Sequence, residues 1–348
     1  VHITCKTRFN MDMVYIILGT NVQESVEFLN TYFSWGLLVA ILSVTVLLIL
    51  LKLWKSRIDY IGRKTSAVLV ILLLFSLFSV FSRDSQNWEG IFLNKISSFL
   101  RYQSPPDLAK YYTYPEIAKN HNDEPDYVVM IIGESFSKSH SSLYGYKKNT
   151  NPHLSSMAED SSLIVFTNAI APATSTIKVF KSLMSSYMQK YGEDVKWYEC
   201  TTLFEILELS GFNTTWLSNQ SPTGVYDNII AKYADLCDST VWVGSKFQGV
   251  KKVDLDGEVV KILHSMDSTD YFRNKNNFIV IHLMGSHQEF KDRYPIEYDF
   301  FQPTDYMHLP EHQRTTIAQY DNSVLYNDAV IKNILDFFSD KESVVFYF

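Results

Sequence analysis

The chain has 348 residues, 46% of them hydrophobic, and a formal net charge of −7 at pH 7. This length allows one large domain together with an additional segment. The acidic balance, and the lack of a basic cluster in the sequence that follows residue 82, argue against nucleic acid as a partner.

Two stretches of the amino-terminal part, residues 33–51 and 65–82, contain no charged residue and are rich in leucine, valine and isoleucine. Each is about long enough to cross the hydrocarbon core of a bilayer as a helix. Neither has the cleavage site of a signal peptide, and a pair of buried helices in a soluble protein seldom lacks charge over such a length. We therefore predict transmembrane helices over residues 33–53 and 65–82.

The loop between these two helices, residues 54–64, is basic. Against a single acidic residue, Asp59, the loop and its start carry Lys52, Lys55, Arg57, Arg63 and Lys64. The positive-inside rule makes this loop cytoplasmic. Residues 1–32, which we expect to form an extracytoplasmic or interfacial segment, then lie on the other side of the membrane. So do all residues after 82, which places them in the periplasm of a cell with two membranes.

Residues 83–126 are predicted to form an interfacial helix followed by a linker. The helix would lie either on the membrane surface or on the soluble domain. From residue 127 onward strand and helix patterns alternate. Strands are expected near 127–132, 162–167, 213–218, 240–243, 278–283 and 343–348, and helices near 177–189, 202–210, 256–267 and 313–338. Such alternation predicts, over residues 127–348, an α/β domain built on a mostly parallel sheet with helices on both faces.

The first of these strands ends in a carboxylate. Six apolar residues, 127–132, are followed directly by Gly133, Glu134 and Ser135. A buried strand of an α/β sheet delivers an acidic side chain in this way to the carboxyl edge of the sheet, where such folds place their sites. Taken alone, the pattern also fits a core strand followed by an ordinary loop glutamate.

Three hydroxyl residues, Thr174, Ser175 and Thr176, stand where a predicted strand passes into a predicted helix. A hydroxyl at such a position commonly does no more than cap the helix. The start of a helix also offers unpaired N–H groups and the positive end of the helix dipole, which together suit a phosphoryl group. Both interpretations stay open at this point.

Two further strands run into polar residues. One ends in His282-Leu-Met-Gly-Ser-His287, which is followed by Arg293-Tyr-Pro. The other is followed by a polar loop that contains Gln220 and Thr223. Taken alone, the first pattern also fits a structural histidine at the end of a strand, and the second fits an ordinary polar loop after a strand.

The order of these motifs resembles that of the bacterial phosphoethanolamine transferases, membrane enzymes of the alkaline phosphatase/sulfatase superfamily. The segments Ser139-His-Ser-Ser-Leu-Tyr-Gly-Tyr146 and Asn149-Thr-Asn-Pro152 match the opening motif of that family. The resemblance spans roughly residues 10–348. It implies an α/β fold of the alkaline phosphatase/sulfatase type, preceded by transmembrane helices.

The resemblance also implies a zinc site. Glu134 matches a zinc ligand of the family, and Thr176 matches the nucleophile, which is a zinc ligand as well. His287 matches a histidine that serves the substrate or a second, looser zinc, whereas His282 lies inside the strand and is expected to be structural. Zn²⁺ is therefore the expected cofactor. It would activate a threonine hydroxyl, which is a poor nucleophile at neutral pH.

Other positions match substrate contacts of the family. Gln220 and Thr223 occupy positions that line the phosphoethanolamine pocket. Thr20 and Glu24 match a periplasmic Thr-Asn-x-x-Glu segment of the family. These two residues are four apart, so they share one face of a helix, from which they would reach the lipid headgroup.

The resemblance thus implies the transfer of phosphoethanolamine from phosphatidylethanolamine to lipopolysaccharide, on lipid A or on a core sugar, through a covalent phospho-threonine. The protein would be a multi-pass protein of the bacterial inner membrane with its catalytic domain in the periplasm. The alternatives are a phosphoglycerol transferase or a sulfatase of the same superfamily, and an inactive, membrane-tethered binding module. The Cys/Ser-x-Pro-x-Arg motif of sulfatases does not stand near Thr176.

The chain departs from the family pattern in two places. Lys178-Val-Phe-Lys181-Ser182 stands where the family continues with Ser-Val-Pro. The Asp-His metal pair of the family follows a strand that matches residues 344–348, so residues 1–348 are expected to be a fragment that is inactive and holds zinc poorly. For Cys200 and Cys237, both a disulfide and two free thiols are compatible with the sequence.

Overall fold

A computed structural model of the protein describes residues 107–112, 125–188, 195–222, 229–243, 255–269, 271–272 and 276–348. The predicted segments 1–32, 33–53, 54–64 and 65–82, and most of 83–126, lie outside the described residues. Among the residues that are described, no helix is both long enough and apolar enough to cross a membrane.

The centre of the described part is a five-stranded sheet with the strand order β3-β2-β4-β1-β5. Its strands are β1 (Tyr127–Ile132), β2 (Asn213–Ser218), β3 (Ser239–Trp242), β4 (Asn277–His282) and β5 (Ser343–Tyr347). Each neighbouring pair is parallel. Parallel strands need long crossover connections, which the helices between them provide. The predicted parallel sheet is therefore confirmed.

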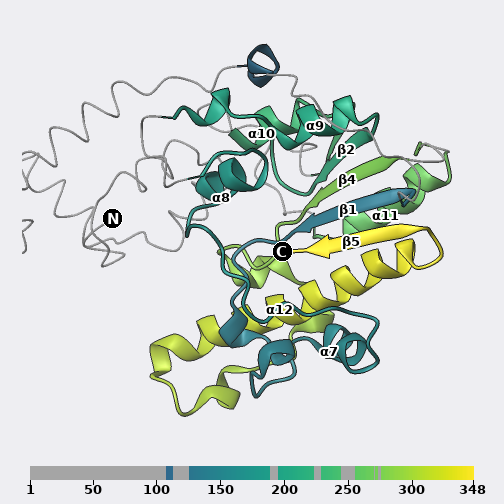
Figure 1. Ribbon diagram of the computed structural model, residues 1–348. Helices are drawn as coiled ribbons and strands as arrows, with labels where there is room; N and C mark the ends of the chain where they lie inside the picture. The colour runs from purple at the N-terminus through teal and green to yellow at the C-terminus, as the bar shows by residue number, and fades with distance from the viewer. Residues whose placement is uncertain are drawn as a thin grey trace, which may run out of the picture. The chain divides into compact units, whose positions relative to one another are not determined.

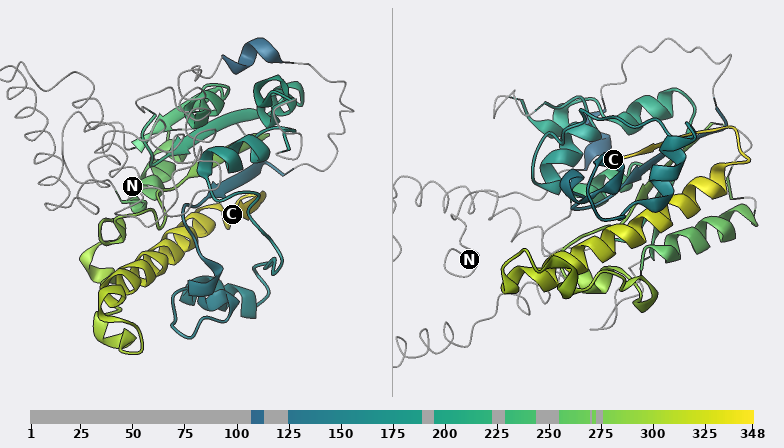
Figure 2. Two further views of the ribbon diagram at one scale, coloured as in Figure 1. Left: turned by 90° about the vertical axis from the view of Figure 1, so that its left-hand side faces the viewer. Right: turned by 90° about the horizontal axis from the view of Figure 1, so that it is seen from below.

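Helices cover both faces of this sheet (Figure 1). On one face lie α8 (Thr176–Leu183), α9 (Leu203–Leu209) and α10 (Ile229–Ala234). On the other lie α7 (Pro152–Glu159), α11 (Gly257–Asp267) and α12 (Glu311–Phe338), the last of which runs beside α11 along the whole face (Figure 2). Short 3₁₀ helices span Leu108–Tyr111, Lys138–His140, Ser142–Tyr144, Trp197–Glu199, Phe290–Arg293, Ile296–Tyr298 and Pro303–Tyr306.

The apolar strands are explained by burial on both sides. Alternate residues of a strand point to opposite faces of the sheet. In β4, Ile279 and Ile281 belong to the core beneath α11 and α12, whereas Phe278 and Val280 belong to the core beneath α8, α9 and α10. Full burial of such a side chain contributes roughly 1.5–3 kcal/mol. Two hydrophobic cores therefore fix the position of β4 from both sides.

The structure corrects part of the predicted element list. The strand expected near 162–167 is wrong: these residues form a loop between α7 and α8, in which Ile164 is 80% and Phe166 67% exposed while Leu163 packs against the core. An apolar segment forms a strand only where a neighbouring strand can pair with its backbone. The helix expected near 177–189 ends at Leu183, where Ser185 leaves the helix to form a β-bridge with Thr202.

Two short helices, α7 and α10, were not predicted, because neither is long enough for a clear helical period. The other described elements agree with the prediction to within about two residues at each end. Cys200 and Cys237 are both free thiols.

Candidate active site

The carboxyl ends of three neighbouring strands meet at one edge of the sheet. Gly133 and Glu134 follow β1, Asn219 and Gln220 follow β2, and residues 283–287 follow β4. The helix α8 lies in the connection from β1 to β2, and its first residue is Thr176. Ligands of open α/β sheets bind at this edge, which makes these three loops the candidate site.

The side chains of Glu134 and Thr176 are in direct contact. The Thr176 hydroxyl donates a hydrogen bond of 3.2 Å to Oε2 of Glu134, which is only 9% exposed. Ser175 occupies the N-cap position of α8, but its side chain makes no capping hydrogen bond. The helix cap that the sequence allowed for one of these hydroxyls is therefore not provided by Ser175. The hydroxyl of Thr176 faces a buried carboxylate at the amino end of a helix, where a helix dipole favours negative charge.

The second carboxylate oxygen of Glu134 faces a fully buried histidine. Nε2 of His282, the last residue of β4, lies 3.5 Å from Oε1 of Glu134. That distance is longer than an ordinary hydrogen bond, and Nε2 has no hydrogen-bond partner among the described residues. The sequence assigned His282 a structural role, whereas the structure makes it an immediate neighbour of the expected zinc ligand.

The surroundings of His282 indicate which ring nitrogen carries the proton. Its Nδ1 lies 3.4 Å from the Ser218 hydroxyl, which already accepts a hydrogen bond of 3.0 Å from the backbone N–H of Gln220. Because a hydroxyl can accept and donate at the same time, Ser218 can also donate to Nδ1, and in that tautomer the proton of a neutral imidazole is on Nε2. This N–H then points toward Glu134, as a group that orients a ligating carboxylate should.

The loop after β4 is fastened to the backbone of Glu134. The N–H of Ser286 donates to the Glu134 carbonyl at 3.0 Å, and the N–H of Leu283 donates to the Ile132 carbonyl at 2.9 Å. Between them Gly285 has a φ of +55°, and a Cβ at this position would lie 2.7 Å from the Glu134 nitrogen. Only glycine satisfies both conditions. The Gly-Ser pair of the motif therefore brings the two loops into contact.

Asp256, the residue before α11, is hydrogen-bonded to the loop that follows β4. It is buried, and it accepts hydrogen bonds of 2.8 Å from the N–H groups of Met284 and Gly285 and from the side-chain amide of Asn219. Burial raises the pKa of Asp256, and these donors oppose the shift. Sequence reasoning missed this residue, because an aspartate before a helix is typical of an ordinary N-cap. In the structure its side chain makes no capping bond.

The segment that follows Glu134 is held in an unusual backbone conformation. Ser135 has a φ of 53°, which is sparsely populated for a residue other than glycine. The Tyr320 hydroxyl, from α12, donates to the Ser135 carbonyl at 2.7 Å and accepts from the Ser137 N–H at 2.8 Å. The long helix thus supports the candidate site directly.

The remaining predicted site residues fall into two groups. His287 is half-buried on the loop that contacts Glu134, and Arg293 braces its backbone by donating to the His287 carbonyl at 3.2 Å. The Gln220 side-chain amide donates to the Leu283 carbonyl at 3.1 Å, so it links the loops after β2 and β4. Thr223, Thr20 and Glu24 lie outside the described residues.

The described side chains provide donors suited to a metal ion without forming a full cluster. Within these ranges there is no group of three or more His, Cys, Asp or Glu side chains that could hold a metal. The Glu134 carboxylate and the Thr176 hydroxyl nevertheless converge, and the orphaned Nε2 of His282 faces them. Carboxylate oxygen is a normal ligand of zinc, and such ligands are oriented by a second group behind them. The residues present therefore fit part of a zinc site.

Known proteins resemble this chain in sequence and in fold. The family model described as Sulfatase matches residues 126–348. The chain is also 23% identical to the phosphoethanolamine transferase EptC of Escherichia coli O18:K1:H7 (strain RS218 / NMEC), over an alignment that covers 98% of this chain and 63% of that protein. The chain thus spans less than two thirds of the length of this relative.

Two solved structures share the fold. One is the C-terminal periplasmic domain of EptC from Escherichia coli in complex with Zn, with a TM-score of 0.58 and 24% identity over 65% of this chain and 63% of that chain. The other is an integral membrane protein, the lipooligosaccharide phosphoethanolamine transferase A (EptA) of Neisseria meningitidis. Its TM-score is 0.69, with 22% identity over 99% of this chain and 67% of that chain. The predicted alkaline phosphatase/sulfatase-like fold of the domain is confirmed.

Proposed function

We propose, from the premise that the chain belongs to the sulfatase family, that it moves phosphoethanolamine from phosphatidylethanolamine to lipopolysaccharide, on lipid A or on a core sugar. One observation carries this proposal. The Thr176 hydroxyl stands at the amino end of α8 and touches the buried Glu134 carboxylate at 3.2 Å. The N–H groups at the start of the helix can bind a phosphoryl group beside this hydroxyl, and the neighbouring carboxylate can bind a cation.

Glu134 and Thr176 are the described residues that would hold zinc. When bound, zinc supplies positive charge that favours the deprotonated hydroxyl and offsets the charge of the phosphoryl group. The two carboxylate oxygens of Glu134 have different neighbours, since Nε2 of His282 faces Oε1 while the Thr176 hydroxyl contacts Oε2. His287 and Gln220, with Thr223, Thr20 and Glu24, are assigned to the substrates.

The transfer consists of two displacements at phosphorus. Oγ of Thr176 attacks the phosphorus of phosphatidylethanolamine, an Oγ–P bond forms, and the bond from phosphorus to the diacylglycerol oxygen breaks, with the hydroxyl proton leaving on diacylglycerol. An acceptor hydroxyl then attacks the same phosphorus, and the Oγ–P bond breaks as Thr176 regains a proton. Positioning and charge neutralisation dominate such a transfer, so a preformed site at a helix start is well suited to it.

A membrane location follows from the lipid substrates and from the sequence. We assign residues 33–53 and 65–82 to membrane spans of a multi-pass protein of the bacterial inner membrane. The basic loop at 54–64 then places the domain after residue 126 in the periplasm. This arrangement brings the catalytic domain to the face on which both lipids are presented.

Mass spectrometry of the phosphorylated peptide tests the proposal. The intact protein, of which residues 1–348 are expected to be a fragment, is incubated in membranes with labelled phosphatidylethanolamine, and the adduct is expected on Thr176. Thr176→Ala should abolish it, while Ser175→Ala is the matched control and should retain it. An adduct on Ser175, or undiminished turnover by Thr176→Ala, would show that the nucleophile is misassigned. A label from phosphatidylglycerol in place of phosphatidylethanolamine would favour a phosphoglycerol transferase.

A further inference from the structure

A cavity of about 630 Å³ lies along the segment that follows β1. Three lysines line it, Lys138, Lys147 and Lys148, together with a single carboxylate, Asp305. The cavity is therefore positively charged, although the whole chain carries a net charge of −7. A cationic cavity in an acidic protein focuses negatively charged ligands.

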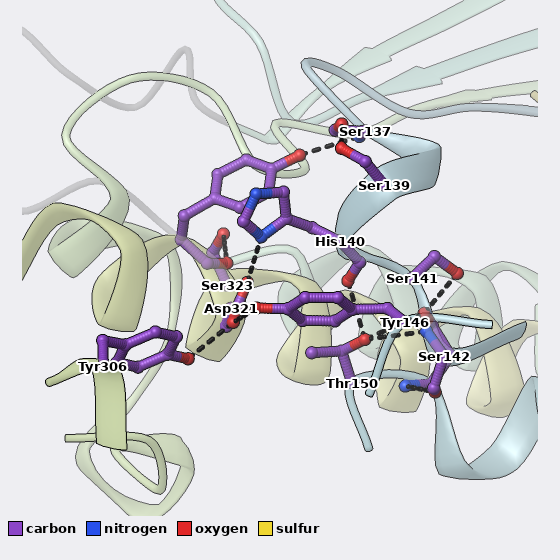
Figure 3. Close-up of polar contacts among 12 residues, drawn as sticks. Ser137, Ser139, His140, Ser141, Ser142, Tyr146, Thr150, Tyr306, Asp321 and Ser323 are labelled. Atoms are coloured by element: carbon purple, nitrogen blue, oxygen red, sulfur yellow. Dashed lines mark hydrogen bonds and ion pairs between the residues drawn. The ribbon is translucent and has the colours of Figure 1, made fainter. Parts of the chain in front are cut away.

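Both segments that line the cavity are bonded to one buried residue of α12 through Tyr146, or through His140 and Tyr306 beside the lining residues (Figure 3). Asp321, which has no exposed surface, accepts hydrogen bonds on Oδ2 from Tyr146 at 2.7 Å and from Tyr306 at 2.5 Å. Its other oxygen lies 2.6 Å from Nδ1 of His140. Burial and the neighbouring Asp321 raise the pKa values of both tyrosines, so they stay neutral donors. The cavity is thus built by a network and is not merely a gap between surface loops.

Two of the lysines are held in place by contacts that preserve their charge. Nζ of Lys138 donates to the Thr167 carbonyl at 2.5 Å, which uses one of the three N–H groups of an ammonium. Nζ of Lys148 lies 4.4 Å from the ring centre of Tyr306, in a cation–π contact that cancels none of its charge. These fixed positive charges suit phosphate, for which lysine acts as a point charge.

The cavity lies close to the candidate active site along the chain. Lys138 follows Glu134 by four residues, and consecutive Cα atoms are 3.8 Å apart, so their Cα atoms are at most about 15 Å apart. Lys138 also contacts Thr167, in the loop that leads to Thr176. Lys138 therefore links the cavity to both segments that carry the candidate active site.

We propose that this cavity binds a phosphate group of the acceptor, a phosphorylated saccharide. The inference rests on the proposed function. The phosphate of the donor lipid must lie against Thr176 during transfer, so a second, separate phosphate site is left for the other substrate. A volume of about 630 Å³ exceeds the size of a phosphate group and leaves room for the attached sugar.

The two half-reactions test this assignment separately. In the double variant Lys147→Gln/Lys148→Gln, the adduct on Thr176 should form from phosphatidylethanolamine at the rate of the unaltered protein. KM for phosphorylated lipopolysaccharide should rise about tenfold or more, because hydrogen bonds to a charged group are lost, and kcat should change little. With enzymatically dephosphorylated lipopolysaccharide the variant and the unaltered protein should behave alike. Lys138 is left intact, since it also holds the loop before Thr176.

Further variants serve as controls for the loss of positive charge and for misfolding. Lys261→Gln/Lys332→Gln removes the same charge from α11 and α12 and should leave KM unchanged. If the double variant does not fold, the exposed Lys147 is replaced alone. Binding of phosphorylated lipopolysaccharide to Thr176→Ala protein gives a readout that needs no turnover, and neutralising the two lysines should weaken it by about tenfold.

Two results would overturn the inference. Equal binding and equal KM with and without the lysines would show that the cavity does not take the acceptor. A loss of adduct formation in the lysine variant would assign the cavity to the donor. An unaltered protein that forms no adduct, yet binds phosphorylated lipopolysaccharide through these lysines, would instead refute the proposed transferase reaction and leave the cavity assignment standing.

Discussion

Glu134 and Thr176, which are in contact in the candidate active site, come from regions with different structural support. Glu134 follows an inner strand of the sheet, and the backbone of the neighbouring strand's loop is bonded to its carbonyl. Thr176 follows a loop, residues 161–175, that exposes several large apolar side chains, among them Phe166 at 67% and Ile170 at 91%. The sheet therefore positions the carboxylate of Glu134, whereas Thr176 is positioned mainly by the helix that begins with it.

The largest effect is expected on the sheet side, at Glu134 itself. Glu134→Gln removes the charge that would hold zinc, and we expect transfer to fall by roughly 100-fold or more and bound zinc to fall with it. Elemental analysis of the purified full-length protein measures the zinc. Glu208→Gln, an exposed substitution on α9, is the matched control. Full zinc occupancy with an altered pH dependence would instead indicate a general base.

The next effect concerns the group behind the carboxylate. His282→Phe keeps the ring but removes the N–H that faces Glu134, and loss of such an orienting group typically lowers metal affinity by roughly 10–100-fold. Competition with a chelator measures this affinity. His264→Phe, which alters a histidine on α11, should leave it unchanged. An unchanged affinity in His282→Phe would return His282 to the purely structural role that the sequence suggested.

A third substitution tests the contact between the loops after β1 and β4. Gly285→Ala places a Cβ 2.7 Å from the Glu134 nitrogen at a φ of +55°. Gly145→Ala shares a positive φ, of +94°, but its Cβ would have no neighbour within 4 Å in the described part of the chain. We expect Gly285→Ala to lower the free energy of unfolding by about 1–3 kcal/mol more than Gly145→Ala does. Denaturant unfolding of both variants provides the comparison, and equal losses would mean that the loops are not in tight contact.

The same difference between regions explains what the sequence could predict. Strands β1 and β4 are continuous apolar runs buried on both faces, so their positions and the polar residues at their ends were readable. The apolar residues 162–167 have the composition of a strand, yet they find no strand to pair with. Asp256 was missed because its partners, Met284 and Gly285, are distant in the sequence. Local patterns report local structure, and contacts of this kind become visible only when the fold brings the segments together.

The smallest effect is expected on the loop side. Phe166→Ser and Ile170→Ser remove side chains that are 67% and 91% exposed, so little apolar surface returns to water when the protein unfolds. Each should change the free energy of unfolding by no more than about 0.5 kcal/mol, as surface substitutions usually do. Ile281→Ser, at a fully buried position of β4, is the opposite control and should cost several kcal/mol, since it opens a cavity and buries a hydroxyl. Denaturant unfolding in one buffer measures all three. A loss above about 2 kcal/mol in Phe166→Ser would mean that its side chain is buried in the folded protein, and the contrast between a braced carboxylate and a loosely supported loop would no longer hold.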